Sequence, residues 1–350
     1  MNIEELTPAA LGFALPAPWA PHARTWMAWP CRTELWGEGL VAAQAAYAQA
    51  ARALARFEPV IMVARTEDVP AARLACGPGI DIVTFGIDDS WMRDIAPHYV
   101  TDGRGAKAGV AWRFNAWGNK YRGYAGDAAF GRFSLERAAI KAFTPNMVLE
   151  GGAIASNGDG TLMATEECLL NPNRNPELTK SDIEEHLALY LGVRKVIWLD
   201  EGLMGDETDG HVDNVACFAG ETRVLLAMPP AVDAENHARM EENARRLGRA
   251  QTARGERLEI VPVPMPAPRF ADDGRRLTLS YLNFAVANGG LVVPAFDDPA
   301  DLEAARVLAA CYPGRIVTQI EALPILAGGG GLHCITYEEP ADTSGAGDSP

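Results

Sequence analysis

The sequence predicts an α/β fold in which a unit of strand, strand, helix and strand recurs about five times and closes around a central axis. Short apolar runs occur in pairs, separated by Gly, Asn or Asp turns that are typical of hairpins. Helical stretches separate these pairs, and a further short strand follows each helix. The repeat length is roughly 50 to 70 residues, which is typical of radial or stacked repetition.

The elements are expected in the following order. A proline-rich lead-in, 16–21, precedes a short aromatic strand at 26–30, an alanine-rich amphipathic helix at 38–57 and strands at 60–64 and 80–85. Hairpin-like segments are expected at 96–114, 150–165, 211–228, 280–294 and 331–338. The helices between them are expected at 133–143, 181–191, 234–250 and 300–311, and further strands at 195–199, 258–263 and 315–319. A doubly wound parallel sheet is the competing architecture, but hairpins argue against it because parallel strands are joined by crossovers.

Domain organisation follows from the lack of internal linkers. Residues 1–340 are expected to form a single catalytic domain, because no Pro-, Gly- or Ser-rich stretch divides the body. Residues 341–350 have no apolar periodicity, so we expect a disordered tail.

Net charge and the cysteine pattern indicate what kind of molecule the protein binds and in which compartment it lies. The chain has 31 Lys plus Arg against 46 Asp plus Glu, a formal charge of −15. This balance disfavours nucleic acid and anionic membranes and suits a small cationic substrate, although many proteins are acidic for solubility alone. The six cysteines are scattered without CxxC pairs, and no signal peptide or membrane-spanning run is visible. These features predict reduced thiols, no structural zinc and a cytoplasmic location.

A polar residue lies at or just before the first strand of each predicted hairpin. These residues are Asp94, Glu150, His211 with Asp213, Asn283 and Cys334. If five units close around an axis, residues at these equivalent positions converge on one pocket.

Cys334 is the candidate nucleophile. Cysteine is most often buried as a small apolar residue, so a single cysteine is a weak signal. Cys334 differs from Cys76, Cys168, Cys217 and Cys311 because it follows the glycine run 328–331, where bare backbone lets a substrate approach closely.

Two acidic segments and one glutamate could serve this thiol. Alternation along a strand would place His211 and Asp213 on one face, so that a base and an acid address one pocket. Asp88, Asp89 and Asp94 flank Trp91, and carboxylates beside an aromatic ring suit a planar guanidinium ion. Glu150 precedes two glycines at a strand entrance.

A metal-dependent hydrolase is the alternative interpretation of these residue types. The other histidines, His333 among them, are expected to lie in unrelated contexts, and the repeated His/Asp clusters of a two-metal site are missing from the sequence.

Seven motifs, taken together, resemble the agmatine deiminases of the guanidine-modifying (pentein) superfamily, over about residues 12–340. The motifs are 26–30 (WMAWP), 89–94 (DSWMRD), 114–118 (FNAWG), 150–152 (EGG), 171–176 (NPNRNP), 208–214 (TDGHVDN) and 330–336 (GGLHCIT). Two segments depart from the family pattern: Gly-Gly-Gly-Gly-Leu-His-Cys replaces Gly-Gly-Gly-Asn-Ile-His-Cys, and Tyr337-Glu338 replaces polar Gln pairs.

The resemblance implies a five-bladed α/β propeller, a homo-oligomer, and hydrolysis of agmatine to N-carbamoylputrescine and ammonia in putrescine biosynthesis. It implies that Cys334 forms an amidino-cysteine intermediate and that His211 is the general acid/base. It further implies that Asp94 and Asp213 hold the guanidinium, with Glu150 supporting the histidine, and that no metal or other cofactor is required.

For the far end of agmatine, the resemblance points to Glu207, and the acidic segment beside Trp91 offers Asp88 as a second candidate. Peptidylarginine deiminase and amidinotransferase activities share the core chemistry and stay open. A metal-dependent, agmatinase-like ureohydrolase and a guanidine-binding protein without activity are further alternatives.

Overall fold

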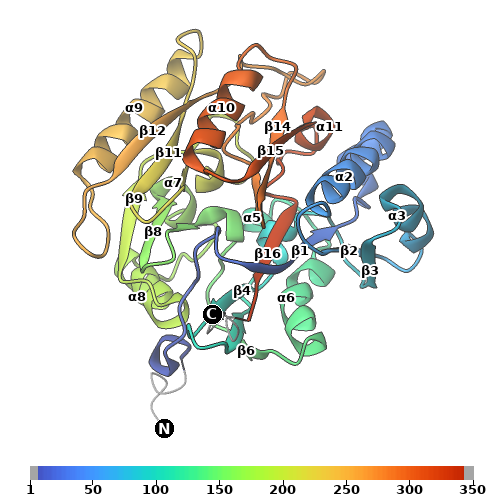
Figure 1. Ribbon diagram of the computed structural model, residues 1–350, viewed down its shortest axis with the longest axis horizontal. Helices are drawn as coiled ribbons and strands as arrows, with labels where there is room; N and C mark the ends of the chain where they lie inside the picture. The colour runs from blue at the N-terminus through green and yellow to red at the C-terminus, as the bar shows by residue number, and fades with distance from the viewer. Residues whose placement is uncertain (1–6, 343–350) are drawn as a thin grey trace, which may run out of the picture.

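The computed structural model describes residues 7–342, which form a mixed α/β fold (Figure 1). Within these residues the strands make five separate sheets, one of four strands and four of three. The predicted α/β class is confirmed, and a single doubly wound sheet is excluded. The predicted tail lies, for residues 343–350, outside the described residues.

Four of the sheets share one connectivity. The first two strands pair antiparallel as a hairpin, and the second strand then pairs in parallel with a third that follows a helix. These sheets are β4 (His98–Thr101), β5 (Lys107–Val110) and β6 (Lys141–Phe143); β7 (Ala155–Ser156), β8 (Thr161–Thr165) and β9 (Lys195–Leu199); β10 (Ala216–Phe218), β11 (Arg223–Met228) and β12 (Glu259–Pro264); and β13 (Ala285–Ala287), β14 (Gly290–Ala295) and β15 (Ile316–Glu321). The predicted unit of strand, strand, helix and strand is therefore confirmed.

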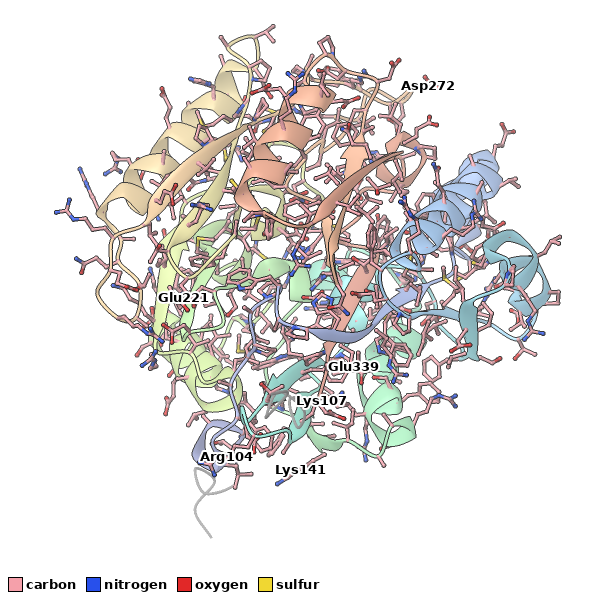
Figure 2. All side chains as sticks on the ribbon, in the orientation of Figure 1. Arg104, Lys107, Lys141, Glu221, Asp272 and Glu339 are labelled. Atoms are coloured by element: carbon pink, nitrogen blue, oxygen red, sulfur yellow. The ribbon has the colours of Figure 1, made fainter. Side chains whose placement is uncertain are left out.

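The remaining sheet joins the two ends of the described chain. Its strand order is β16-β1-β2-β3, with β16 (Thr336–Pro340), β1 (His22–Ala28), β2 (Val60–Ala64) and β3 (Ile80–Thr84). The blue β1 and the red β16 of Figure 1 pair antiparallel, with Trp26 opposite Tyr337. Glu339 of β16 accepts a hydrogen bond from the Trp26 indole of β1 at 2.9 Å, which stabilises this pair. Glu339 also forms an ion pair at 2.7 Å with Lys107 of β5 (Figure 2). The predicted strand at 26–30 starts earlier and ends at Ala28.

Helices connect the strands and pack against the sheets. They are α1 (Thr33–Trp36), α2 (Leu40–Leu54), α3 (Val69–Cys76), α4 (Met92–Ile95), α5 (Ala116–Asn119), α6 (Ala125–Arg137), α7 (Glu166–Leu169), α8 (Lys180–Leu191), α9 (Ala234–Arg249), α10 (Asp301–Cys311) and α11 (Leu323–Leu326). The predictions for α2, α8, α9 and α10 are confirmed to within a few residues. Among the described residues, no helix is both long and apolar enough to span a bilayer.

The helix predicted at 133–143 is wrong. The observed α6 starts at Ala125 and ends at Arg137, and the next residues turn at Ala139, which has a left-handed φ of 53°. The chain then pairs with β5 as the strand β6, so that tertiary hydrogen bonds override a local helical pattern.

Close contact between α6 and β5 depends on a glycine. A Cβ atom built on Gly109 would lie 2.2 Å from a terminal carbon of Leu135, a fully buried residue of α6. The helix can therefore rest directly on the strand backbone at this point.

This contact predicts the effect of a single methyl group. Gly109→Ala should lower the free energy of unfolding by about 1–3 kcal/mol, because the core must move to admit the added carbon. The measurement is the midpoint of urea unfolding. Gly248→Ala is the matched control, because Gly248 is exposed in α9 and a Cβ there meets no atom within 4 Å. Equal loss in both variants would contradict the packing argument.

Candidate active site

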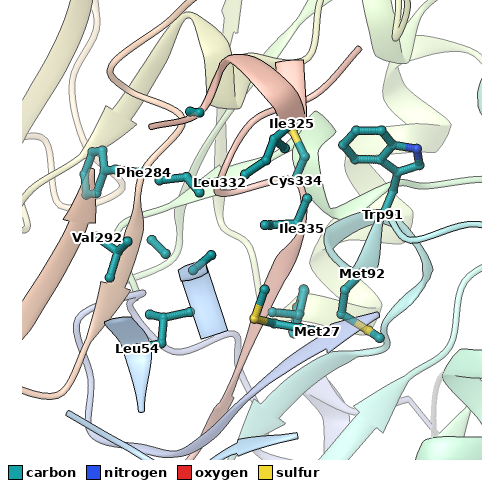
Figure 3. Close-up of a cluster of buried hydrophobic side chains, with 14 of the residues drawn as sticks. Met27, Leu54, Trp91, Met92, Phe284, Val292, Ile325, Leu332, Cys334 and Ile335 are labelled. Atoms are coloured by element: carbon teal, nitrogen blue, oxygen red, sulfur yellow. The ribbon is translucent and has the colours of Figure 1, made fainter. Parts of the chain in front are cut away.

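One cavity brings several of the predicted site residues together. Its empty space, including the part open to solvent, is about 350 Å³, and it is lined by Trp91, Asp94, Trp117, Tyr121, Glu207, Thr208, Gly328, Gly329, Gly330 and Cys334. The lining residues come from segments that are far apart in the sequence, as expected if the hairpin entrances converge. Figure 3 shows Cys334 beside Trp91, above a floor of apolar residues that includes Ile335.

Cys334 lies just before β16 and is 5% exposed. The side-chain amide of Asn283 donates to its sulfur at 3.2 Å, and the Asp213 carboxylate lies 3.7 Å from the same atom. The Asn283 carbonyl oxygen also accepts the backbone N–H groups of His333 and Cys334, at 2.9 and 3.3 Å. Asn283 therefore fixes both the sulfur and the backbone that carries it.

Burial, followed by the negative charges of Asp213 and Asp94, raises the pKa of Cys334 well above the ordinary thiol value. At neutral pH the residue is therefore a thiol until a positive charge arrives beside it.

The glycines before Cys334 line the cavity and also allow tight packing. A Cβ on Gly330 would lie 2.5 Å from the Trp91 ring, and one on Gly331 would lie 2.5 Å from the Asn283 side chain. Trp91 in turn stacks on Trp36 with ring centroids 5.8 Å apart. Neither Gly330, in the cavity wall, nor Gly331, next to it in the chain, could therefore be a larger residue without a shift of its neighbours.

Asp94 belongs to the short helix α4, and both of its oxygens are engaged. One oxygen accepts the Gly152 N–H at 2.9 Å and the other accepts the Trp117 indole N–H at 2.8 Å. Trp117 reaches it from a backbone with a left-handed φ of 55°. Burial is the main factor that raises the pKa of Asp94, against the lowering effect of His211.

His211 and Asp213 lie together, but not for the predicted reason. Strand alternation is wrong, because β10 begins only at Ala216 and Asp213 lies in a 3-10 turn, η5 (Val212–Asn214), that His211 precedes. The absent side chain of Gly152 makes room for both: its Cβ would lie 2.5 Å from His211 Nδ1 and 3.0 Å from Asp213 Oδ2.

The His211 ring is fully buried, with Nδ1 3.9 Å from an Asp94 oxygen. Burial alone would lower the pKa of His211, but Asp94, Cys168 and Glu150 outweigh it and raise this pKa well above the ordinary value. These charges favour the protonated imidazole, which is the form that can donate a proton.

Glu150 is fully buried and accepts the Arg174 Nε–H at 2.6 Å. Arg174 also binds Asp209 at 2.6 Å and the Thr208 carbonyl at 2.8 Å, which ties Glu150 to the loop before His211. Glu150, Cys168 and His211 are the one group within residues 7–342 whose donor atoms are close enough to share a metal ion. A lone imidazole, a thiol and an arginine-paired carboxylate do not match the oxygen-rich donors of a two-metal hydrolase.

His333 is a site residue that the sequence interpretation missed. Its Nδ1 lies 2.8 Å from Asp213 Oδ2, so the expectation of an unrelated context is wrong. Although burial opposes it, the charges and hydrogen bond of His333, with help from His211 and Arg93, lower the pKa of Asp213. The sequence signal that could have identified His333 is its position directly before Cys334.

Arg93 was also missed, although it precedes Asp94. Its backbone N–H donates to the Cys334 carbonyl at 3.0 Å, and its guanidinium donates to the His333 carbonyl at 3.3 Å. The guanidinium also pairs with Glu338 at 2.6 Å and lies 4.6 Å from the centre of the Tyr337 ring. The departure at Tyr337-Glu338 thus supplies the two contacts that hold Arg93 against the nucleophile segment.

The two candidates for the far end of a substrate differ in position. Glu207 lines the cavity, where it accepts the Tyr121 hydroxyl at 2.8 Å and pairs with Arg275 at 3.1 Å. The Asp88 carboxylate instead accepts the Gly126 N–H at 2.7 Å, and Asp88 is outside the set of described residues that line this cavity. The structure therefore brings Glu207, and not Asp88, into the cavity with Cys334.

Residues 14–340 match the family of Porphyromonas-type peptidyl-arginine deiminases. The chain belongs to this family. Within it, the chain is 43% identical over 358 residues to the agmatine deiminase of Stutzerimonas stutzeri, covering 96% of this chain and 97% of that protein. It is 42% identical over 360 residues to the agmatine deiminase of Pseudomonas aeruginosa, again covering 96% and 97%.

A solved structure of an agmatine deiminase has a similar fold. The agmatine deiminase of Enterococcus faecalis superposes with a TM-score of 0.93 at 30% identity, over 96% of this chain and 98% of that one. The resemblance to agmatine deiminases that the seven motifs indicated is confirmed.

The environment of Cys334 predicts how it reacts in the free protein. Alkylation of this residue by iodoacetamide should be slow at neutral pH and accelerate only above the ordinary thiol pKa of about 8.5. The rate is measured by mass spectrometry, with Cys334→Ser as the blank. Asp213→Asn should move the profile to lower pH by about one unit, because it removes a neighbouring negative charge. Asp81→Asn, in the exposed part of β3, is the control, and a profile already at its plateau at pH 7 would refute the assignment.

Proposed function

We propose that the protein is an agmatine deiminase, which hydrolyses agmatine to N-carbamoylputrescine and ammonia. One observation carries this proposal: the cavity has a thiol at Cys334, a buried carboxylate at Asp94 and a second, partly exposed carboxylate at Glu207. Agmatine is a planar guanidinium joined to an ammonium ion, so it matches two separated acidic groups. The agmatine deiminases of Stutzerimonas stutzeri and Pseudomonas aeruginosa, at 43% and 42% identity, support the same conclusion.

In this proposal Asp94 and Asp213 orient the guanidinium beside the sulfur. The ring of Trp91 forms part of the cavity wall there. Glu150 holds the charge and position of His211, while Glu207 receives the ammonium of the tail. Each Asp94 oxygen already accepts one hydrogen bond within the protein. The carboxylate is therefore fixed before the guanidinium binds, so orienting the substrate costs no side-chain freedom of Asp94.

The proposed reaction has two halves. The bound guanidinium favours loss of the Cys334 proton to solvent, and the thiolate attacks the central carbon to form a C–S bond and a neutral tetrahedral adduct. Protonated His211 then donates to one nitrogen, the C–N bond breaks and ammonia leaves, so that an amidino-cysteine remains. Neutral His211 next removes a proton from water as the water oxygen attacks the same carbon, and collapse of this adduct expels the sulfur and yields the ureido product.

We further propose that the five sheets are the blades of a five-bladed α/β propeller and that residues 1–340 form one catalytic domain. The repeated connectivity of the sheets and the convergence of their hairpin entrances support this arrangement. A cytoplasmic location, a role in putrescine biosynthesis and a homo-oligomeric assembly belong to the same proposal.

The products distinguish the proposal from its alternatives. Incubation with agmatine in the presence of EDTA should release ammonia and N-carbamoylputrescine in equal amounts and no urea, because water replaces one nitrogen at the guanidine carbon. Chromatography of the products and an ammonia assay provide the measurement. Urea and putrescine, with activity lost to EDTA, would indicate a metal-dependent ureohydrolase, and binding without any product would indicate a guanidine-binding protein.

The covalent route predicts the behaviour of a nucleophile variant. Cys334→Ala should lower kcat by at least about a thousand-fold, because the chemistry has no other nucleophile, whereas agmatine should still bind. Turnover and equilibrium binding are measured together. Cys76→Ala, a buried cysteine in α3, is the matched control and should keep the parental rate. Parental ammonia release by Cys334→Ala would eliminate the amidino-cysteine intermediate.

A further inference from the structure

The carboxylate at the tail end of the cavity already has a cationic partner. One Glu207 oxygen accepts the Tyr121 hydroxyl at 2.8 Å, and the other lies 3.1 Å from a guanidinium nitrogen of Arg275. The ion pair is partly open to solvent, since the side chains of Arg275 and Glu207 are 33% and 32% exposed. An incoming ammonium ion must therefore share or take the place of Arg275.

Arg275 comes from a separate turn and ties it to the site. Ala271 donates its N–H to the Arg275 carbonyl at 2.8 Å, which closes a turn between β12 and β13. The Arg275 guanidinium also donates to the Ala327 carbonyl at 2.8 Å, directly before the glycine run that lines the cavity. Arg275 thus joins three segments: its own turn, the Glu207 loop and the glycine run.

Glu207 keeps its place without Arg275. The Tyr121 hydroxyl holds its side chain, and the Lys120 ammonium donates to its backbone carbonyl. A partly exposed ion pair contributes little net stability, so opening the Arg275 contact costs little. None of the described residues that line the cavity is a lysine or an arginine, so Arg275 is the cation that a substrate tail meets at Glu207.

We propose that Arg275 is a displaceable counter-ion of Glu207, which a cationic substrate tail must replace, an inference that rests on the proposed function. The distal ammonium of agmatine replaces the guanidinium on Glu207, because the two positive charges repel each other and the carboxylate binds either. The displaced Arg275 then releases the Ala327 carbonyl, so that charge at the tail loosens the turn at 271–275 from the glycine run. A guanidine with an uncharged tail leaves the ion pair closed.

The test measures binding in a background without turnover. Agmatine and 1-butylguanidine, which lacks the terminal amine, are titrated by calorimetry into Cys334→Ser and into Cys334→Ser with Arg275→Gln. Removing the competing cation should tighten agmatine binding by about two- to five-fold, the range expected for a surface ion pair, and leave 1-butylguanidine unchanged. Arg269→Gln is the matched control, because Arg269 lies in the same connection between β12 and β13 but its guanidinium donates to the Asp297 carbonyl. This variant should change the affinity for neither ligand.

The calorimetry could overturn the proposal in two ways. Weaker or unchanged agmatine binding in Arg275→Gln would mean that Arg275 positions Glu207 or does not compete, and equal tightening of both ligands would remove the link to tail charge. Hydrogen exchange is the second readout: residues 271–277 should exchange faster with agmatine bound than with 1-butylguanidine bound, and equal exchange contradicts displacement. Agmatine that binds to the natural protein without ammonia release would refute the deiminase function while the calorimetric result for Arg275 stands.

Discussion

Buried negative charge beside a thiol is the constraint on which this site depends. Asp94, Glu150 and Asp213 are all buried, and each is held by hydrogen bonds or an ion pair within the protein. Burial, with the charges of Asp213 and Asp94, favours the protonated thiol of Cys334, and Asp94 and Glu150, against the effect of burial, favour the charged form of His211. This is the opposite of a thiolate and neutral imidazole pair ready to react. In the proposed reaction the substrate cation supplies the missing charge, so the nucleophile forms where and when a guanidinium is present. Such a site protects its thiol from other electrophiles.

Local sequence patterns were sufficient for most elements and for the repeated unit. Helices such as α8 are marked by their own caps, because Thr179 and Asp182 form a capping box and Gly192 ends the helix with a left-handed φ of 67°. The motif around Cys334, together with the hairpin entrances, was enough to gather the nucleophile, His211 and two carboxylates into one site. Two contacts between distant segments were not predicted: the pairing of β1 with β16 and that of β6 with β5. The turn that brings His211 beside Asp213 is local, but it has no apolar pattern. No periodicity within a single segment encodes these.

The residues missed at the site are those that act on other residues. Arg93 holds the nucleophile segment through its backbone, and His333, against the effect of burial, lowers the pKa of Asp213. Sequence reasoning assigns chemistry to reactive side chains more readily than support to their neighbours. The pair Arg93 and Glu338 shows the difficulty, because Glu338, which departs from the family pattern, forms a bidentate ion pair with Arg93 against the Cys334 segment.

The joining of β1 and β16 bears on how the polypeptide acquires activity during its synthesis. Cys334 lies immediately before β16, and the partner strand β1 leaves the ribosome more than three hundred residues earlier. While translation continues, the edge of β1 has no partner, and the growing chain exposes a template for unwanted strand addition. A nascent molecule is therefore inert until β16 has emerged, and the same event pairs β1 and places Cys334 in the site.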